Sequence, residues 1–220
     1  MMQLDFINKP LTIKTPPDFT VISTFAGCGG SSLGYKMAGF TELLAIDWNK
    51  NAEETFKLNF PEVPFWNRDI TTIKGQEVLD FCNIKKGELD VLDGSPPCQG
   101  FSTAGRRNVK DSRNELFKSF IYLIQELEPK VFIMENVSGQ VKGKMKGKFI
   151  EIFKELSSLN YNVKCKLLNA ANYGVPQARQ RLFYIGVRKD LNKQPIFPIP
   201  QSKIITISLA LSGIKPKTIE

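Results

Sequence analysis

One cysteine of the chain is presented by two prolines. Cys98 follows Pro96 and Pro97 in the segment DGSPPCQGFSTAG (93–105), and the prolines restrict the backbone directly before the thiol. Four basic residues follow between positions 106 and 113, and positive potential favours the thiolate. Most cysteines are inert core residues, but a cysteine that follows two prolines in a polar loop is a poor candidate for a core position. The pattern indicates a nucleophile.

An acid and two guanidinium groups could act with this thiol. Glu135 leaves a buried strand in MENV (134–137), and burial raises the pKa of a carboxyl, so Glu135 could donate a proton near neutral pH. Gln177, Arg179 and Arg181 alternate in QARQRLFYIG (177–186), so the two arginines should share one face. The chain has no histidine, which excludes Ser-His-Asp triads and HExxH zinc sites.

A glycine-rich turn, FAGCGGSSLGYKMAGF (25–40), suits a nucleotide-like ligand. Its glycines allow a sharp turn and close approach of the backbone to a ligand, and a helix N-terminus follows. Asp47 ends the next strand, where a carboxylate can accept hydrogen bonds from ribose hydroxyls. Trp48 could lie against an adenine ring or be half-buried in the core. Asp69, in RDI (68–70), falls near the same edge, although taken alone it is better explained as an exposed loop carboxylate.

Strands that alternate with helices must position these residues. Short apolar runs predict strands, and amphipathic stretches between them predict helices. This order predicts an α/β fold with a mainly parallel sheet covered by helices on both faces, and ligands bind at the carboxyl ends of such strands. The expected strands are 19–25, 42–47, 64–67, 89–94, 130–136, 161–170 and 181–188. The expected helices are 31–38, 49–59, 76–81, 114–128 and 147–159.

The composition of the chain bears on its fold class and on which binding partners are expected. A hydrophobic fraction of 42% in 220 residues fits one globular domain, and the net charge of +8 is compatible with an anionic partner such as nucleic acid. The four cysteines form no CxxC pair, so we expect no metal site and no disulfides. The N-terminus lacks a signal peptide and no apolar run reaches membrane-spanning length, so we expect a cytoplasmic protein without a membrane partner.

Together these segments resemble the conserved blocks of the C5-cytosine DNA methyltransferase family. FAGCGGSSLGYKMAGF, DGSPPCQGFS, MENV and QARQR occur in the family's order, and DSRNELF (111–117) and NAANYGVPQ (169–177) are similar to further family segments. The resemblance extends from about Phe19 to Val187. It implies a Rossmann-like methyltransferase fold that uses S-adenosyl-L-methionine and ends its sheet with an antiparallel strand.

The resemblance also implies a mechanism. Cytosine is flipped out of double-stranded DNA, the Cys98 thiolate attacks C6, Glu135 protonates N3, and Arg181 with Arg179 orients the ring while C5 takes the methyl group. The implied cofactor residues are Phe25, Gly27, Gly30, Asp47, Trp48, Asp69, Ile70 and Leu116. The implied substrate-binding residues are Pro97, Gln99, Ser102, Asn136 and Gln177. A role in a restriction-modification system follows by the same analogy.

The sequence departs from the family after the catalytic blocks. We expect a lead-in (1–18), a methyltransferase domain (19–190), and a linker with the start of a truncated target-recognition region (191–220). The remaining recognition domain and a C-terminal helix are missing, so we expect a split subunit or a truncation with negligible activity alone. Three alternatives remain: an RNA (tRNA) cytosine-5 methyltransferase, an inactive homologue that serves as a binding subunit, and a nicotinamide oxidoreductase.

Overall fold

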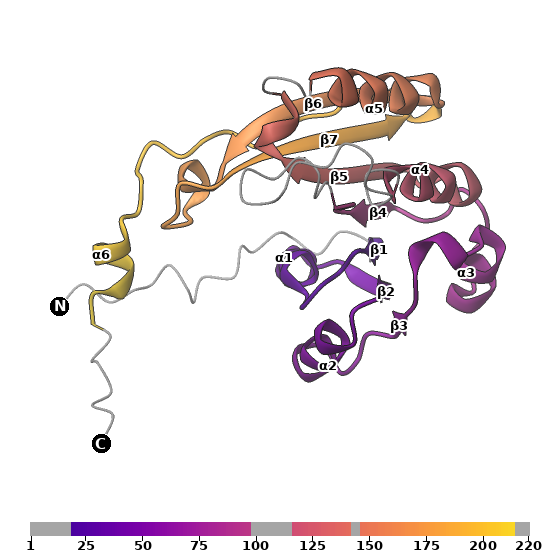
Figure 1. Ribbon diagram of the computed structural model, residues 1–220, viewed down its shortest axis with the longest axis horizontal. Helices are drawn as coiled ribbons and strands as arrows, with labels where there is room; N and C mark the ends of the chain where they lie inside the picture. The colour runs from indigo at the N-terminus through magenta and orange to yellow at the C-terminus, as the bar shows by residue number, and fades with distance from the viewer. Residues whose placement is uncertain (1–18, 98–115, 142–145, 214–220) are drawn as a thin grey trace.

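The computed structural model describes residues 19–97, 116–141 and 146–213 and contains a seven-stranded sheet in the order β3-β2-β1-β4-β5-β7-β6 (Figure 1). Every neighbouring pair is parallel except that β7 runs antiparallel to both β5 and β6. This confirms the expected mostly parallel sheet and its antiparallel strand. The strands are β1 (Thr20–Thr24), β2 (Thr41–Asp47), β3 (Phe65–Asn67), β4 (Val91–Gly94), β5 (Val131–Val137), β6 (Tyr161–Asn169) and β7 (Gln180–Arg188).

The longer helices lie close to their predicted positions. They are α1 (Gly30–Met37), α2 (Lys50–Asn59), α3 (Gly75–Cys82), α4 (Leu116–Leu127) and α5 (Lys146–Ser158). Local chemistry explains one boundary: the Asn49 side chain accepts hydrogen bonds from the N–H groups of Asn51 and Ala52, which caps α2. The sequence did not predict the short helix α6 (Ile207–Leu211) or the single-turn 3-10 helices η1 (Ile70–Thr72), η4 (Ser138–Val141), η6 (Ala170–Tyr173) and η7 (Lys189–Leu191).

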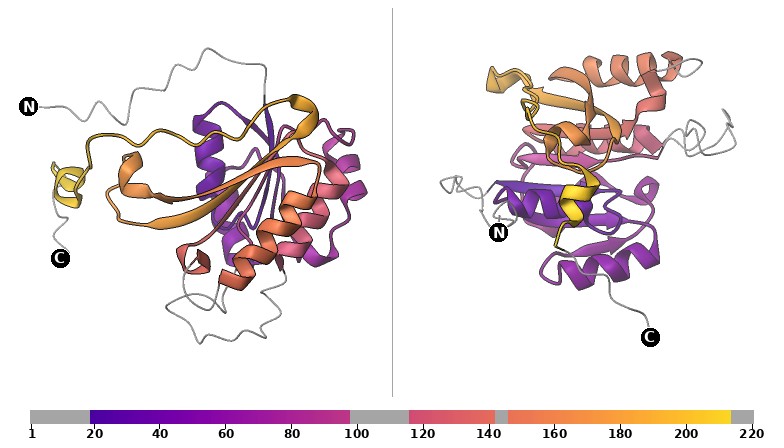
Figure 2. Two further views of the ribbon diagram at one scale, coloured as in Figure 1. Left: turned by 90° about the horizontal axis from the view of Figure 1, so that it is seen from above. Right: turned by 90° about the vertical axis from the view of Figure 1, so that its left-hand side faces the viewer.

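The main core fills the side of the sheet on which α3, α4 and α5 pack (Figure 2). Helix α4 is strongly amphipathic and buries Phe117, Phe120 and Ile124 there, and Phe120 meets Phe132 of β5 edge to face. On the opposite side, α2 packs Phe56 against Ala45 of β2 in a smaller cluster. No helix of the described residues is long and apolar enough to cross a membrane.

The α1 side of the sheet is covered over only part of its width. Helices α1 and α2 contact β1, β2 and β3. Farther along the sheet, Ile133 of β5 pairs with Ile185 of β7, and both side chains stay partly exposed on this side. Among the described residues, no helix packs over them. A mostly parallel sheet normally carries helices on both faces, and within the described ranges this part of the α1 side has no such cover.

Candidate active site

Polar side chains from several elements meet at one edge of the sheet. Asp47 and Glu135 lie at the carboxyl ends of β2 and β5, while Asp69 and Ser95 follow β3 and β4. Parallel strands direct these ends to the same edge, which is where ligands bind in such sheets. The topology therefore groups residues that are up to 88 positions apart in the sequence, from Asp47 to Glu135.

A cavity of about 570 Å³ opens at this edge, a size typical of small-molecule and cofactor sites. It is lined by every residue for which the sequence predicted a cofactor role except Gly30, and also by Pro97, for which a substrate contact was expected. The lining residues are Phe25, Gly27, Ile46, Asp47, Trp48, Asn49, Ala52, Arg68, Asp69, Ile70, Thr71, Ser95, Pro97 and Leu116.

The glycine-rich turn forms one wall and is fastened to β2. Gly27 N–H donates to Asp47 Oδ2 at 2.9 Å, and Asn49 N–H donates to Asp47 Oδ1 at 2.9 Å. Phe25 and Gly27 both have positive φ, at 56° and 54°. For Phe25 this left-handed conformation is strained by about 1–2 kcal/mol, which the surrounding hydrogen bonds must offset. Asp47 thus shapes the turn, in addition to any contact with a ligand.

The turn also requires a glycine at position 29 for steric reasons. Its φ is 91°, and a Cβ atom there would lie 2.3 Å from the Phe60 ring. A larger residue would therefore displace the turn or the Phe56–Phe60 cluster behind it. Gly30 begins α1, and a Cβ atom at that position would have no heavy atom within 4 Å, so no comparable steric constraint applies there.

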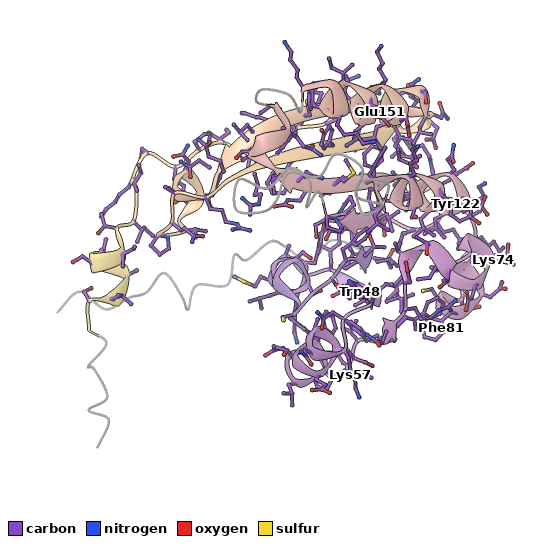
Figure 3. The ribbon with its side chains drawn as sticks, in the orientation of Figure 1. Trp48, Lys57, Lys74, Phe81, Tyr122 and Glu151 are labelled. Carbon is purple, nitrogen blue, oxygen red and sulfur yellow. The ribbon has the colours of Figure 1, made fainter. Side chains whose placement is uncertain are left out.

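Trp48 and Asp69 also line the cavity. Trp48, which is labelled in Figure 3, is 74% exposed, so the half-buried core position considered from the sequence is wrong. Its ring is available to a flat ligand. Asp69 Oδ1 accepts from both Thr71 N–H and Thr71 Oγ1 at 2.9 Å, which fixes its carboxylate at the start of η1.

Sequence reasoning missed several lining residues, of which Arg68 and Ser95 are the most polar. Arg68 lies over the Trp66 ring at 5.3 Å and pairs with Glu77, and Ser95 donates to the Phe25 carbonyl at 3.4 Å. Both directly follow predicted strands. Residues that follow the carboxyl ends of parallel strands lie at the ligand-binding edge, and this rule could have placed Arg68 and Ser95 there as it placed Asp69.

Glu135 and Arg181 form an ion pair at the same edge of the sheet. Arg181 Nε lies 2.7 Å from Glu135 Oε1, and the two side chains are 24% and 28% exposed. Arg181 sits at the start of β7, opposite Val137 of β5, which brings it to the edge where Glu135 ends its strand. Burial raises the pKa of Glu135, although the charges of Arg181 and Arg179 oppose the rise. A partly buried carboxyl of this kind can hold a proton closer to neutral pH than an ordinary glutamate.

A second, more polar hollow of about 400 Å³ lies next to this pair. Gln177, Arg179 and Arg181 all line it, so the structure brings together the three alternating polar residues of QARQR. Ser138, Asn169, Ala178 and Gln180 complete the lining. The two guanidinium groups give the hollow a positive character that suits an electron-rich ligand atom or a phosphate.

Asn136 points away from Glu135, into the core. It is 2% exposed, its Nδ2 donates to the Pro96 carbonyl at 3.3 Å, and its Oδ1 accepts from Val137 N–H at 2.8 Å. The substrate contact expected of Asn136 stays a prediction. What the geometry provides is a tether between the end of β5 and the Pro-Pro turn that precedes Cys98.

Three predicted site residues, Cys98, Gln99 and Ser102, lie outside the described residues, as do the basic residues between positions 106 and 113. Pro97, which immediately precedes Cys98 in the chain, lines the cofactor-sized cavity. Of the described cysteines, Cys82 and Cys165 are poor nucleophiles because burial raises the pKa of both thiols, for Cys82 to about 11. Cys28 is exposed.

Comparisons with known proteins show which family the chain resembles. The model of the C-5 cytosine-specific DNA methylase family matches residues 19–216. Type II methyltransferase M.DdeI of Desulfomicrobium norvegicum is 43% identical over 190 residues, which cover 84% of this chain and 44% of that protein. Type II methyltransferase M.AquIA of Picosynechococcus sp. is 39% identical over 190 residues, which cover 82% of this chain and 75% of that protein.

Solved structures show the same fold. One described as a DNA modification methyltransferase encoded within an E. coli prophage has a TM-score of 0.79 and 33% identity, covering 92% of this chain and 57% of that one. Spodoptera frugiperda DNMT2 has a TM-score of 0.61 and 28% identity, covering 86% and 55%. The chain spans about half the length of M.DdeI and of several other curated relatives.

Proposed function

The chain belongs to the C-5 cytosine-specific DNA methylase family, and we propose that it is the cofactor-binding and catalytic part of an enzyme that methylates C5 of cytosine in double-stranded DNA. The observation that carries the proposal is the Glu135–Arg181 pair, which lies at the same sheet edge as a cofactor-sized cavity lined by Pro97. Because several relatives are type II methyltransferases, a restriction-modification system is the setting that we propose.

The cavity fits S-adenosyl-L-methionine in size and in the character of its lining. The exposed Trp48 ring can stack on the adenine, and the fixed carboxylates of Asp47 and Asp69 can accept hydrogen bonds from hydroxyl or amino groups. Phe25, Ile70 and Leu116 supply apolar contacts. When bound, the cofactor supplies a methyl group on a positively charged sulfur.

The chemistry on the base follows from the acid and the guanidinium groups. In the proposed reaction the Cys98 thiolate adds to C6 of a flipped cytosine, and Glu135 donates its proton to N3 as negative charge develops on the ring. Arg181 and Arg179 hold the ring by hydrogen bonds from the polar hollow. C5 then accepts the methyl group. Transfer of the C5 proton to water re-forms the C5–C6 double bond and expels the Cys98 thiolate from C6, and N3 returns its proton to Glu135.

A further polypeptide segment completes the enzyme in this proposal, either as a second chain or as a later part of the same one. The catalytic part accounts for about half the length of the relatives, and one half of the α1 side of the sheet has no helix over it among the described residues. A target-recognition domain would account for the remaining length of the relatives, and a helix after it would cover the open part of the sheet. The match covers 75% of M.AquIA, so that relative is only about a third longer than its matched part.

The cofactor site can be tested on the chain alone. S-adenosylhomocysteine should raise the melting temperature, and NAD should not. Trp48→Ala should reduce the shift while leaving the melting temperature of the free protein unchanged. A shift with NAD alone would favour the oxidoreductase alternative.

The reaction can be tested with duplex DNA that carries 5-fluorocytosine, which traps the enzyme because C5 has no proton to lose. With the C-terminal part of M.DdeI supplied as a second chain, we expect a covalent adduct on the wild type and on Cys28→Ser, and none on Cys98→Ser. Adduct formation on an equivalent tRNA substrate but not on DNA would point to RNA methylation. Methyl transfer by this chain without any partner would contradict the proposed division of the enzyme.

A further inference from the structure

Asp93, near the end of β4, shares one face of the sheet with Glu135. Gly94 faces α4, because a Cβ atom there would lie 2.5 Å from Phe120, so Asp93 points to the opposite side. Tyr35 of α1 confirms this direction by donating its hydroxyl to Asp93 Oδ1 at 3.2 Å. Asp93 pairs with Ile133 in the parallel register of β4 and β5, and Glu135 is the next residue of β5 on that face.

The surroundings of Asp93 are polar and partly buried. Tyr35 and Ser31 reach it from α1, and the charges of Glu42 on β2 and Glu135 on β5 act on it. Glu42 is itself held by Ser32 Oγ at 3.0 Å. Burial raises the pKa of Asp93 to about 7, and the two acidic charges add to the rise, whereas the hydrogen bonds from Ser31 and Tyr35 oppose it. Burial also raises the pKa of Tyr35, which keeps its hydroxyl a neutral donor.

Glu135 therefore lies between charges of opposite sign. Arg181 and Arg179 face it from β7 and the segment before it, and their charges stabilise its carboxylate. Asp93 faces it from β4. Because two neighbouring carboxyl groups resist being ionised together, the charge of Glu135 raises the pKa of Asp93, and we expect the charge of Asp93 to act on Glu135 in return.

We propose that Asp93 is a positioning residue of the methyl-transfer site, whose negative charge opposes that of Glu135 and so favours the protonated Glu135 that the reaction requires. This inference rests on the proposed function, which makes Glu135 the acid that protonates cytosine N3. In this inference Asp93, which accepts a hydrogen bond from Tyr35 of α1, offsets part of the stabilisation that Arg179 and Arg181 give to the Glu135 carboxylate.

The size of the coupling follows from the strand geometry. Diagonal neighbours on one face of a sheet lie about 7–8 Å apart. At that separation, with an effective dielectric constant of about 30, two unit charges shift each other's pKa by about one unit. The protonated fraction of Glu135 should thus change about tenfold between the charged and neutral states of Asp93.

The coupling can be measured on the chain alone by carboxyl carbon NMR. With Asp and Glu side chains labelled, Asp93 should titrate near pH 7 in the wild type. Its pKa should fall by about one unit in Glu135→Gln. It should rise in Tyr35→Phe, which removes a hydrogen bond to the carboxylate. Glu151→Gln, which removes a charge from α5 on the other side of the sheet (Figure 3), is the matched control and should leave Asp93 unmoved. Titration of Asp93 near its ordinary value, or no response to Glu135→Gln, would overturn the inference.

The consequence for catalysis is measured in the completed enzyme. The ratio of kcat for Asp93→Asn to kcat for the wild type should fall about tenfold between pH 6 and pH 8.5, because only the wild type gains a negative charge at position 93 over that range. A ratio that stays constant with pH would mean a purely structural role and would overturn the inference while leaving DNA methylation intact. No methyl transfer by the wild type at any pH would instead overturn the proposed function.

Discussion

Replacing Arg181 with glutamine would leave the Glu135 carboxylate without the cation that lies 2.7 Å away. Breaking a fully buried ion pair by removing one partner costs about 3–5 kcal/mol, and breaking an exposed pair costs about 0–1 kcal/mol. These side chains are 24% and 28% exposed, which is between the two limits. We therefore expect Arg181→Gln to lower the free energy of unfolding by about 1–2 kcal/mol near pH 8.

The loss should depend on pH with a definite sign. Burial raises the pKa of Glu135 in the folded state above its unfolded value, so the contribution of this group is fully present below the unfolded pKa and declines as pH rises through the folded pKa. Without the Arg181 charge the folded pKa is higher still, and the decline is larger. The difference between the variant and the wild type should therefore be small near pH 4, where Glu135 is neutral in both, and should grow toward pH 8.

Urea unfolding at pH 4 and pH 8 would measure both values. Lys57→Gln is the control, since Lys57 forms an exposed ion pair with Glu53 on α2 (Figure 3), and it should cost no more than about 0.5 kcal/mol. Adding Glu135→Gln to Arg181→Gln should recover most of the loss, because no uncompensated charge remains. A loss at pH 8 no larger than that of the control, or one that does not grow with pH, would refute the electrostatic account of the pair.

Three further predictions concern the loops at the sheet edge. Asn136→Ala should cost about 1–2 kcal/mol, seen as a lower urea midpoint, because it removes the bond to Pro96, and it should slow trapping by 5-fluorocytosine. Gly29→Ala should lower both the melting temperature and the affinity for S-adenosylhomocysteine, since its Cβ would lie 2.3 Å from Phe60. Trp48→Ala should weaken S-adenosylhomocysteine binding about five- to tenfold in calorimetry, the value of one lost stacking contact, and should leave stability unchanged.

The sequence predicted most of the fold because its signals are local and strong. Apolar runs such as VFIMEN mark strands that are buried on one or both faces, and Asn49 marks the start of a helix by capping it. Single-turn helices and α6 carry too few residues to show a period, so they were missed. Alternation along β5 could have shown that Asn136 faces the core with Met134, away from Glu135.

Features that depend on tertiary contacts were beyond the sequence. The two roles considered for Trp48 differ only in exposure, which is decided by how α2 and the glycine-rich turn pack. The fastening of Gly27 by Asp47 joins residues 20 positions apart, and the contact of Tyr35 with Asp93 joins residues 58 apart. In each case the residue types permit several partners, and only the fold selects one.

The direction of β7 is the feature on which the Glu135–Arg181 ion pair depends. Arg181 lies at the beginning of β7 and Arg179 directly precedes the strand, and the beginning of a parallel strand falls at the edge opposite the ligand site. Because β7 runs antiparallel to β5, its first residues lie beside the last residues of β5, and Arg181 meets Val137 in the register. Glu135 then has its cation 2.7 Å away at the edge where the cofactor-sized cavity opens. A parallel β7 would leave Glu135 without this cation, so the proposed chemistry depends on the reversed strand.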